Sequence, residues 1–163
     1  MYRAATPPSP LLITAANGVM TAFDRRTGAP VWVVRPEAPL KWPQVSRVVA
    51  DELRVVAVSA QVNETGFFAS ADGAADLICV EYLTGRLLWR QRVGVGLNVG
   101  FFTATLMIDQ GQVFLVHGTV LAAFALDTGA HVWSQEVEGS MATGNRPLPV
   151  ALCVPGRSEQ ADR

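Results

Sequence analysis

A short phrase occurs three times in this chain at one internal spacing, and it limits the fold more than any other feature of the sequence. In each copy an apolar run ends three residues before a Thr-Gly pair, and a tryptophan follows the glycine by four residues. The copies are AFDRRTGAPVW, VEYLTGRLLW and FALDTGAHVW, with Gly28, Gly85 and Gly129 as the glycines and Trp32, Trp89 and Trp133 as the tryptophans. A phrase repeated in register indicates a chain built from structural repeats.

The repeated unit is predicted to consist of short strands. Apolar, β-branched and aromatic runs are set off by Asn-Gly, Thr-Gly and Gln-Gly turns, whereas a helix would need longer runs with a 3.6-residue period. Besides those that carry Trp89 and Trp133, the runs predict strands at 11–16, 19–24, 30–34, 46–50, 53–60, 76–81, 104–108, 112–117 and 120–125. About four strands per repeat of about 40–45 residues are typical of a propeller blade.

The third copy carries a family resemblance. The run FTATLMIDQGQVFLVHGTVLAAFALDTGAHVW resembles the repeat of the pyrroloquinoline-quinone-like (PQQ-like) β-propellers, in which two strands and their glycine turns precede LYALD, Thr-Gly and a tryptophan. The resemblance covers 11–36 and 44–138, and it implies an all-β propeller of four-stranded antiparallel blades. It also implies that the three tryptophans pack between neighbouring blades and that, with the three turn glycines, they dock one blade on the next.

The chain departs from the family pattern at the acidic residue three positions before Thr-Gly. This residue is Asp24 in the first copy and Glu81 in the second, whereas the third copy has Ala125, and its acid, Asp127, lies nearer the turn. Such an acid caps a turn by accepting hydrogen bonds from backbone N–H groups. We therefore expect one bond fewer at the third turn and no change of fold.

The repeats predict three blades over 11–156, preceded by an N-terminal arm (1–10) and followed by a tail (157–163). The first blade has room for three strands only. The C-terminal run RPLPVALCVPG, 146–156, is typical of a strand that opens a repeat. We expect it to complete the first blade, either of its own chain or of a neighbour.

Three blades are too few for a ring, because propellers have four to eight. An open fan would expose apolar sheet faces at both ends. We therefore expect a homo-oligomer, most simply two chains that form a six-bladed ring. A nine-bladed trimer and capping by another protein subunit stay open as alternatives.

The second repeat holds an insertion. The turn glycines are 57 and 44 residues apart (85 − 28 and 129 − 85), so about 13 residues are extra, and we place them in a loop at 61–75. Long insertions on repeat scaffolds often lie on a binding face. Phe67 and Phe68, which are adjacent in this segment, are the expected partner-binding residues.

Composition and charge exclude some classes of partner. The net charge is −1, which gives no electrostatic reason to expect nucleic acid or an anionic membrane. No uninterrupted apolar run reaches the 18 residues of a membrane span. The first residues show no export signal, so the expected location is cytoplasmic, with Cys79 and Cys153 as free thiols.

The sequence predicts no catalytic, cofactor or metal site. His117 and His131 have no serine, cysteine or acid at a recognisable catalytic spacing, and we expect solvated or turn positions for both. Cys79 falls at a small position that Ala22 and Ala123 fill in the other copies, and the cysteines and histidines form no zinc motif.

For two further sets of residues we expect a structural role and no functional one. The glycine-rich run at 94–100 lacks the spacing of a phosphate loop, so we expect a connection between blades. The arginine clusters read as solvated edge residues; they are Arg25, Arg26, Arg86, Arg90 and Arg92.

These observations predict a non-enzymatic propeller that acts as a scaffold for protein–protein interaction, as a homo-oligomer or within a larger assembly. One alternative is an enzyme or ligand sensor whose site forms on the axis of an assembled ring. Another is a periplasmic assembly scaffold, because the chain also resembles the propeller scaffolds of outer-membrane assembly.

Overall fold

The computed structural model describes residues 9–16, 18–35, 44–63, 72–97, 104–142, 146–147 and 150–159. Every regular element in these ranges is a β-strand. The strands of the three large sheets are β1 (Leu11–Ala16), β2 (Val19–Asp24), β3 (Pro30–Val34), β4 (Gln44–Ala50), β5 (Arg54–Asn63), β6 (Asp72–Glu81), β7 (Leu87–Leu97), β8 (Thr105–Asp109), β9 (Gln112–His117), β10 (Val120–Ala125) and β11 (His131–Glu136).

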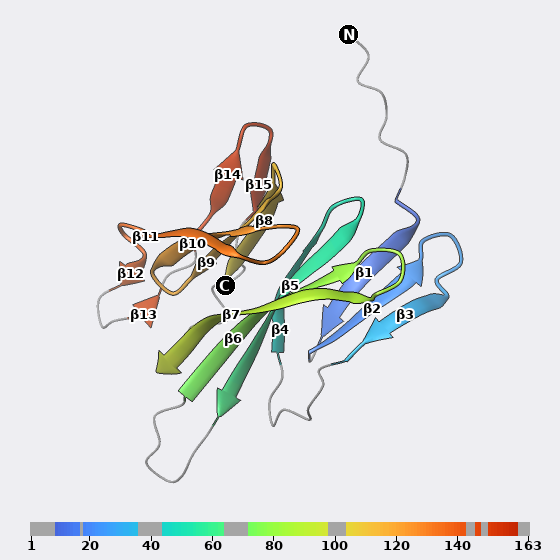
Figure 1. Cartoon of the computed structure of the whole chain (residues 1–163), viewed down its shortest axis with the longest axis horizontal. Coiled ribbons are helices and arrows are strands. Elements are labelled where there is room, and N and C mark those ends of the chain that lie inside the picture. Colours follow the sequence, from blue (N-terminus) through green and yellow to red (C-terminus); the bar gives the residue numbers. More distant parts are fainter. Residues whose placement is uncertain are drawn as a thin grey trace.

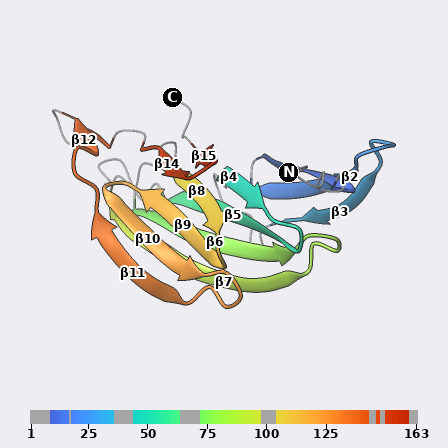
Figure 2. The same cartoon turned by 90° about the horizontal axis from the view of Figure 1, so that it is seen from above.

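These strands form three antiparallel sheets, each from one stretch of chain. The first has the order β1-β2-β3, the second β4-β5-β6-β7 and the third β8-β9-β10-β11. The sheets stand side by side in chain order (Figure 1), and a view from above shows them as an open fan (Figure 2). The all-β class and the blade-like antiparallel sheets predicted from the sequence are confirmed.

The Thr-Gly phrase forms the same turn three times. Gly28, Gly85 and Gly129 have φ values of 71°, 70° and 73°, a region that glycine occupies without steric cost. Each glycine N–H donates to the carbonyl oxygen four residues earlier, at 2.8–2.9 Å. A bulge follows, and the tryptophan then lies opposite a buried small residue: Ala22, Cys79 or Ala123.

One turn acid, Asp24, acts as the sequence predicts, whereas Glu81 accepts hydrogen bonds from the side chains of Thr84 and Arg86. Asp24 Oδ1 accepts hydrogen bonds from the backbone N–H groups of Arg26 and Thr27, at 3.0 and 2.7 Å. The Thr27 hydroxyl also donates to it, and these bonds lower the pKa of Asp24. The third turn lacks the acid at Ala125 but keeps its backbone bond to Ala130, at 2.8 Å.

The hydrophobic core lies between the sheets. One buried cluster joins the first and second sheets and includes Met20, Trp32, Val55 and Val80. A larger one joins the second and third sheets; its members include Val58, Leu77, Trp89, Leu106, Leu115 and Phe124. Apolar side chains from facing sheets therefore hold neighbouring sheets together.

The insertion in the second repeat is in part a continuation of the sheet. β5 and β6 have ten residues each, against six each for β9 and β10. Residues 61–63 and 72–75, which we expected in a loop, are paired strand residues. The run 94–97, expected in a connection, extends β7 along the same ladder. Extending the ladder gives these backbone N–H and C=O groups hydrogen-bond partners, which a loop would leave to water.

The C-terminal segment does not join the first sheet of its own chain. β12 (Met141–Ala142) pairs with β13 (Arg146–Pro147), and β14 (Leu152–Val154) pairs with β15 (Arg157–Glu159). Within the described residues the first sheet keeps three strands, while β14 lies beside β8. The Pro155-Gly156 turn, with Gly156 at φ 79°, folds β15 back onto β14, and Arg157 binds this hairpin to the third sheet by donating a hydrogen bond to the carbonyl oxygen of Ile108. Part of the expected tail is therefore strand.

Candidate functional site

The contacts between neighbouring sheets repeat from one pair of sheets to the next. Trp32 Nε1 donates a hydrogen bond to the carbonyl oxygen of Tyr82, and Trp89 Nε1 donates to that of Leu126, both at 2.9 Å. Each indole also covers the turn glycine of the next sheet. A Cβ added to Gly85 would lie 2.7 Å from Trp32 Cδ2, and one on Gly129 would lie 2.5 Å from Trp89 Cε3. We call this pair of contacts the inter-blade lock.

The third tryptophan and the first turn glycine lie outside any lock in the described chain. Trp133 is 36% exposed, against 8% for Trp32 and 9% for Trp89. Its ring contacts Phe114 of its own sheet, with 6.1 Å between the ring centroids. At the other end of the fan Gly28 is exposed, and a Cβ there would have nothing within 4 Å.

Tyr82 is a buried residue at the contact between the first and second sheets. The sequence alone did not predict a role for it. Its hydroxyl accepts a hydrogen bond from Leu11 N–H at 2.9 Å and donates one to the Leu11 carbonyl oxygen at 2.8 Å. The residue of the second sheet that corresponds to Leu11 is Arg54, at the start of β5. Its backbone bonds to Asp51 in the β4–β5 turn. Among the described residues no strand pairs with the free edge of β1, and Tyr82 supplies hydrogen bonds to the backbone of Leu11 at that edge. The available signal was a hydroxyl-bearing aromatic three residues before Gly85.

Two hollows flank the second sheet. A groove of about 620 Å³ lies between β1 and the end of β4, and its lining includes Leu11, Ile13, Val48 and Tyr82. A smaller hollow of about 380 Å³ lies between β7 and the third sheet; its lining includes Arg92, His117, Phe124, His131 and Ser134. The lining of the second hollow brings the two histidines of the chain together.

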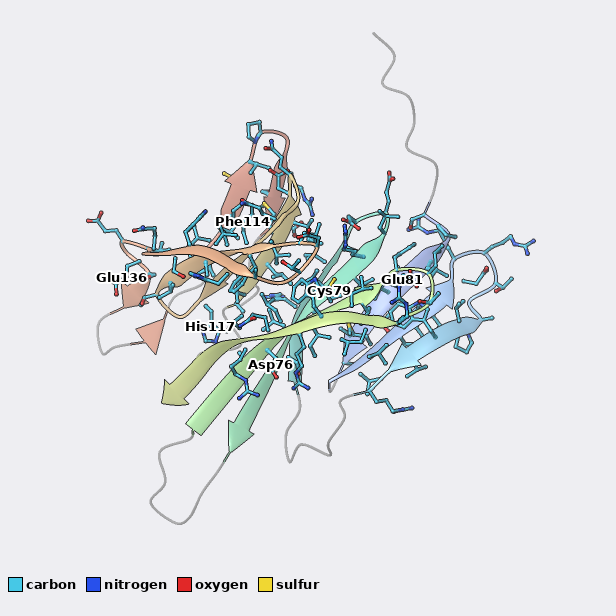
Figure 3. The ribbon with its side chains drawn as sticks, in the orientation of Figure 1. Asp76, Cys79, Glu81, Phe114, His117 and Glu136 are labelled. Atoms are coloured by element: carbon cyan, nitrogen blue, oxygen red, sulfur yellow. The ribbon has the colours of Figure 1, made fainter. Side chains whose placement is uncertain are left out.

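The two histidines differ in environment. His131 is exposed, and its Nε2 lies 2.6 Å from Ser134 Oγ. His117 is half-buried between β7 and the third sheet (Figure 3), so its expected solvated position is wrong. Burial lowers the pKa of His117 to about 4, which keeps its imidazole neutral at pH 7. The burial of His117 is caused by the neighbouring second sheet, whose position the local sequence around His117 does not reveal.

A buried carboxylate explains two of the arginines. Asp76 of β6 is 3% exposed and forms ion pairs with Arg90 and Arg92 of β7 (Figure 3 labels Asp76). The reading of these two arginines as merely solvated edge residues is therefore corrected. Arg92 lies directly opposite Asp76 across the ladder, and Arg90 lies opposite Ile78. This register, which the single strand does not reveal, brings the charges together.

The cysteines are both free thiols. Cys79 is buried, and desolvation raises its pKa to about 12, so the thiolate is not accessible at pH 7. Cys153 is exposed.

Among the described residues no group of three or more His, Cys, Asp or Glu side chains could hold a metal ion. The same residues form no helix that is long and apolar enough to cross a membrane. Phe67 and Phe68 lie outside the described residues, between β5 and β6.

Comparison with known proteins identifies one family. The profile of the family described as outer membrane protein assembly factor BamB, a PQQ-like repeat family, matches residues 13–156 and confirms the resemblance found in the sequence. The outer membrane protein assembly factor BamB of Kangiella koreensis is 34% identical over 136 residues, which are 82% of this chain and 31% of that protein. The crystal structure of BamB from Moraxella catarrhalis aligns with a TM-score of 0.61 at 18% identity, and the alignment covers 95% of this chain and 44% of that one.

These matches carry one correction. The chain spans about a third of the curated relative it matches. The expected cytoplasmic location is wrong, because the matched family and relative are named for the assembly of outer membrane proteins. That expectation relied on the absence of an export signal in the first residues. The start of a sequence that spans 31% of its relative cannot support it.

Proposed function

This chain belongs to the BamB family of outer membrane protein assembly factors, and from that premise we propose that it is a non-enzymatic scaffold that binds other proteins in the periplasm during this assembly. The family match over residues 13–156 is the observation that carries the proposal. The names of the family and of the relative describe assembly factors, which supports a binding role over catalysis.

The physical basis of such a role is a stiff frame. Each sheet is fixed to the next by apolar packing and by a buried hydrogen bond, at Trp32 and at Trp89. Loops on a frame of this kind keep their relative positions, so a partner binds without first ordering the sheets. Fold alone does not specify a partner. The partner-binding residues are therefore sought among the loops.

We place the partner contact at Phe67 and Phe68. The hairpin β5–β6 that leads to them is longer than the corresponding hairpin β9–β10, by four residues in each strand. This length carries the ends of the two strands, at Asn63 and Asp72, beyond the level at which the other hairpin turns. Adjacent phenylalanines supply the large apolar area that is typical of interface anchors.

The three described sheets of the proposed scaffold do not close a ring. Three sheets in an open fan leave one flank at the first sheet and one at the third. We propose that the blades of a second copy cover both flanks and form a six-bladed homodimer. Other protein subunits in the same positions are the alternative occupant.

The scaffold role is tested in a Gram-negative host that lacks its own assembly factor of this family. The chain is expressed with an export signal, and folded outer membrane protein is measured by the change in its electrophoretic mobility on heating. We expect the chain to raise this amount above the level given by an empty vector. An unchanged amount, with the chain folded and abundant in the periplasm, overturns the proposal.

The same assay tests the partner contact. Phe67→Ser with Phe68→Ser should lower the amount of folded outer membrane protein. The matched control is Leu83→Ser with Leu87→Ser, two exposed apolar side chains of the same sheet, which should leave it unchanged. If the phenylalanine pair behaves like this control while the chain itself is active, the scaffold role stands and the site assignment fails.

A further inference from the structure

Two arginines of β7 share one buried carboxylate on a single face of the second sheet. Arg90 and Arg92 are two residues apart, so their side chains leave the strand on the same face. Both form ion pairs with Asp76 of the neighbouring strand β6. The side chain of Asp76 is buried, whereas those of Arg90 and Arg92 are 35% and 53% exposed. Asp76 thus holds the two guanidinium groups in place, while solvent reaches their outer side. We call Arg90 and Arg92 the arginine pair.

The arginine pair carries more charge than Asp76 balances. Two guanidinium groups face one carboxylate, which leaves one positive charge in excess. Arginine keeps its proton in proteins, so this excess does not disappear with a change of pH. The whole chain has a net charge of −1, so the excess is a local feature of this face. It favours an anion as the ligand.

The bonds to Asp76 leave the outer edge of each guanidinium group available. Arg90 and Arg92 both bond to the Asp76 carboxylate through Nε and Nη2. A guanidinium group has five N–H donors, and the two on Nη1 take no part in these bonds. Nη1 and Nη2 together form an edge that binds a carboxylate through two parallel hydrogen bonds. Because Asp76 already orders both side chains, a second carboxylate binds with a smaller loss of conformational entropy.

The strand that carries the arginine pair is the outer strand of its sheet. β7 pairs with β6 on one side, and no described strand pairs with its other side. Figure 2 shows β7 along the outer side of the fan. The second sheet has four strands and a neighbouring sheet on each side, so this open edge does not depend on how the chain continues at either end.

An open edge of this kind selects its ligand by charge and spacing. Positive side chains on an edge strand disfavour pairing with apolar or basic strands. An extended segment that lies along β7 presents every second side chain to the face of the arginine pair, about 7 Å apart. Two acidic residues with one residue between them therefore match Arg90 and Arg92, since opposite charges across a ladder attract.

We propose that the arginine pair binds an extended acidic segment of a partner protein, which lies along β7 and places one carboxylate on each guanidinium group. Each carboxylate accepts hydrogen bonds from Nη1 and Nη2 of one arginine, while Asp76 keeps its own bonds to the inner edge. The two acidic residues are separated by one residue. This inference rests on the scaffold function proposed above and names the chemistry of one segment that the scaffold binds.

A titration of the wild-type chain with two peptides, followed by nuclear magnetic resonance, tests the proposal. The acidic peptide is TTEVETT, acetylated and amidated at its ends, and TTQVQTT is the neutral match. The acidic peptide should shift the Nε–H signals of Arg90 and Arg92 and bind at least about tenfold more tightly than the neutral one. Equal binding of the two peptides, or unchanged arginine signals, overturns the proposal. Acetate that binds as tightly as the acidic peptide overturns the extended segment as the ligand.

Substitutions separate the geometry of the arginine pair from its charge. Arg90→Lys with Arg92→Lys keeps both charges but replaces each planar fork by an ammonium group. The acidic peptide should bind this variant at least about fivefold more weakly. The control is Arg86→Gln, which removes an exposed charge of the same sheet and should leave the affinity unchanged. Wild-type affinity in the lysine variant, or an equal loss in the control, overturns the proposal.

The two levels of the inference fail separately. The comparison of peptides uses the wild-type chain, so it decides the matter even if the lysine variant does not fold. Failure of the acidic peptide to bind leaves the scaffold role standing, because that role is measured through folded outer membrane protein in cells.

Discussion

Trp89 donates its indole hydrogen to the carbonyl oxygen of Leu126, 37 residues later in the chain, across a distance of 2.9 Å. This bond joins the second sheet to the third, and both of its groups are buried. A directional bond between sheets supplements the apolar packing, because a buried carbonyl without a donor is costly. The recurrence of the same bond between Trp32 and Tyr82 means that the phrase in the sequence encodes both a turn and a sheet-to-sheet contact.

The first prediction concerns the glycine beneath the indole. Gly129→Ala should lower the free energy of unfolding by about 2–5 kcal/mol, because alanine disfavours a positive φ and its Cβ would crowd the indole. The relevant distance is 2.5 Å to Trp89 Cε3. Urea unfolding, followed by circular dichroism at a concentration where the chain is monomeric, measures the change.

Gly28→Ala is the matched control. Its φ of 71° is close to the 73° of Gly129, but a Cβ there would have nothing within 4 Å. The expected loss is about 1–2 kcal/mol, which is the backbone cost alone. Equal losses for the two variants would show that the indole does not depend on Gly129.

A second prediction concerns the buried carboxylate of Asp76. Replacing both partners, Arg90→Gln with Arg92→Gln, leaves a negative charge that is 3% exposed without its cations. The expected loss in the free energy of unfolding is about 3–5 kcal/mol. Asp76→Asn should cost less, about 1–2 kcal/mol, because the arginines are half-exposed and can be hydrated. Urea unfolding of both proteins gives the comparison, and a larger loss for Asp76→Asn would contradict it.

The parts of the fold that the sequence predicts well are those fixed by local turn chemistry. The strands Val19–Asp24 and Val120–Ala125 have the predicted bounds, because each ends at a glycine turn with its own hydrogen bonds. The burial of Cys79 follows for the same reason, since the turn fixes which residue lies opposite the tryptophan.

The parts that the sequence does not predict depend on partners far along the chain. The continuation of β5 and β6 through the insertion depends on a third strand, β7, which extends beside them. The bond between Tyr82 and Leu11 joins residues 71 positions apart. The ion pairs of Asp76 depend on the register of two strands. A single segment contains no record of these neighbours, so pattern and propensity alone could not find them.

The last prediction concerns stability at mildly acidic pH. Burial lowers the pKa of His117 to about 4, while an unfolded chain has the ordinary value of 6.5. Between these values the unfolded chain binds more protons, so the stabilisation is complete above pH 6.5 and is lost as the pH falls towards 4. The full loss is about 3 kcal/mol. His117→Gln should remove this part of the slope, measured by urea unfolding between pH 6.5 and pH 5. Asp24 and Glu81 do not interfere in that range, because their hydrogen bonds hold the pKa of each below its ordinary value. A variant with the slope of the wild type would mean that His117 is protonated without cost in the folded chain.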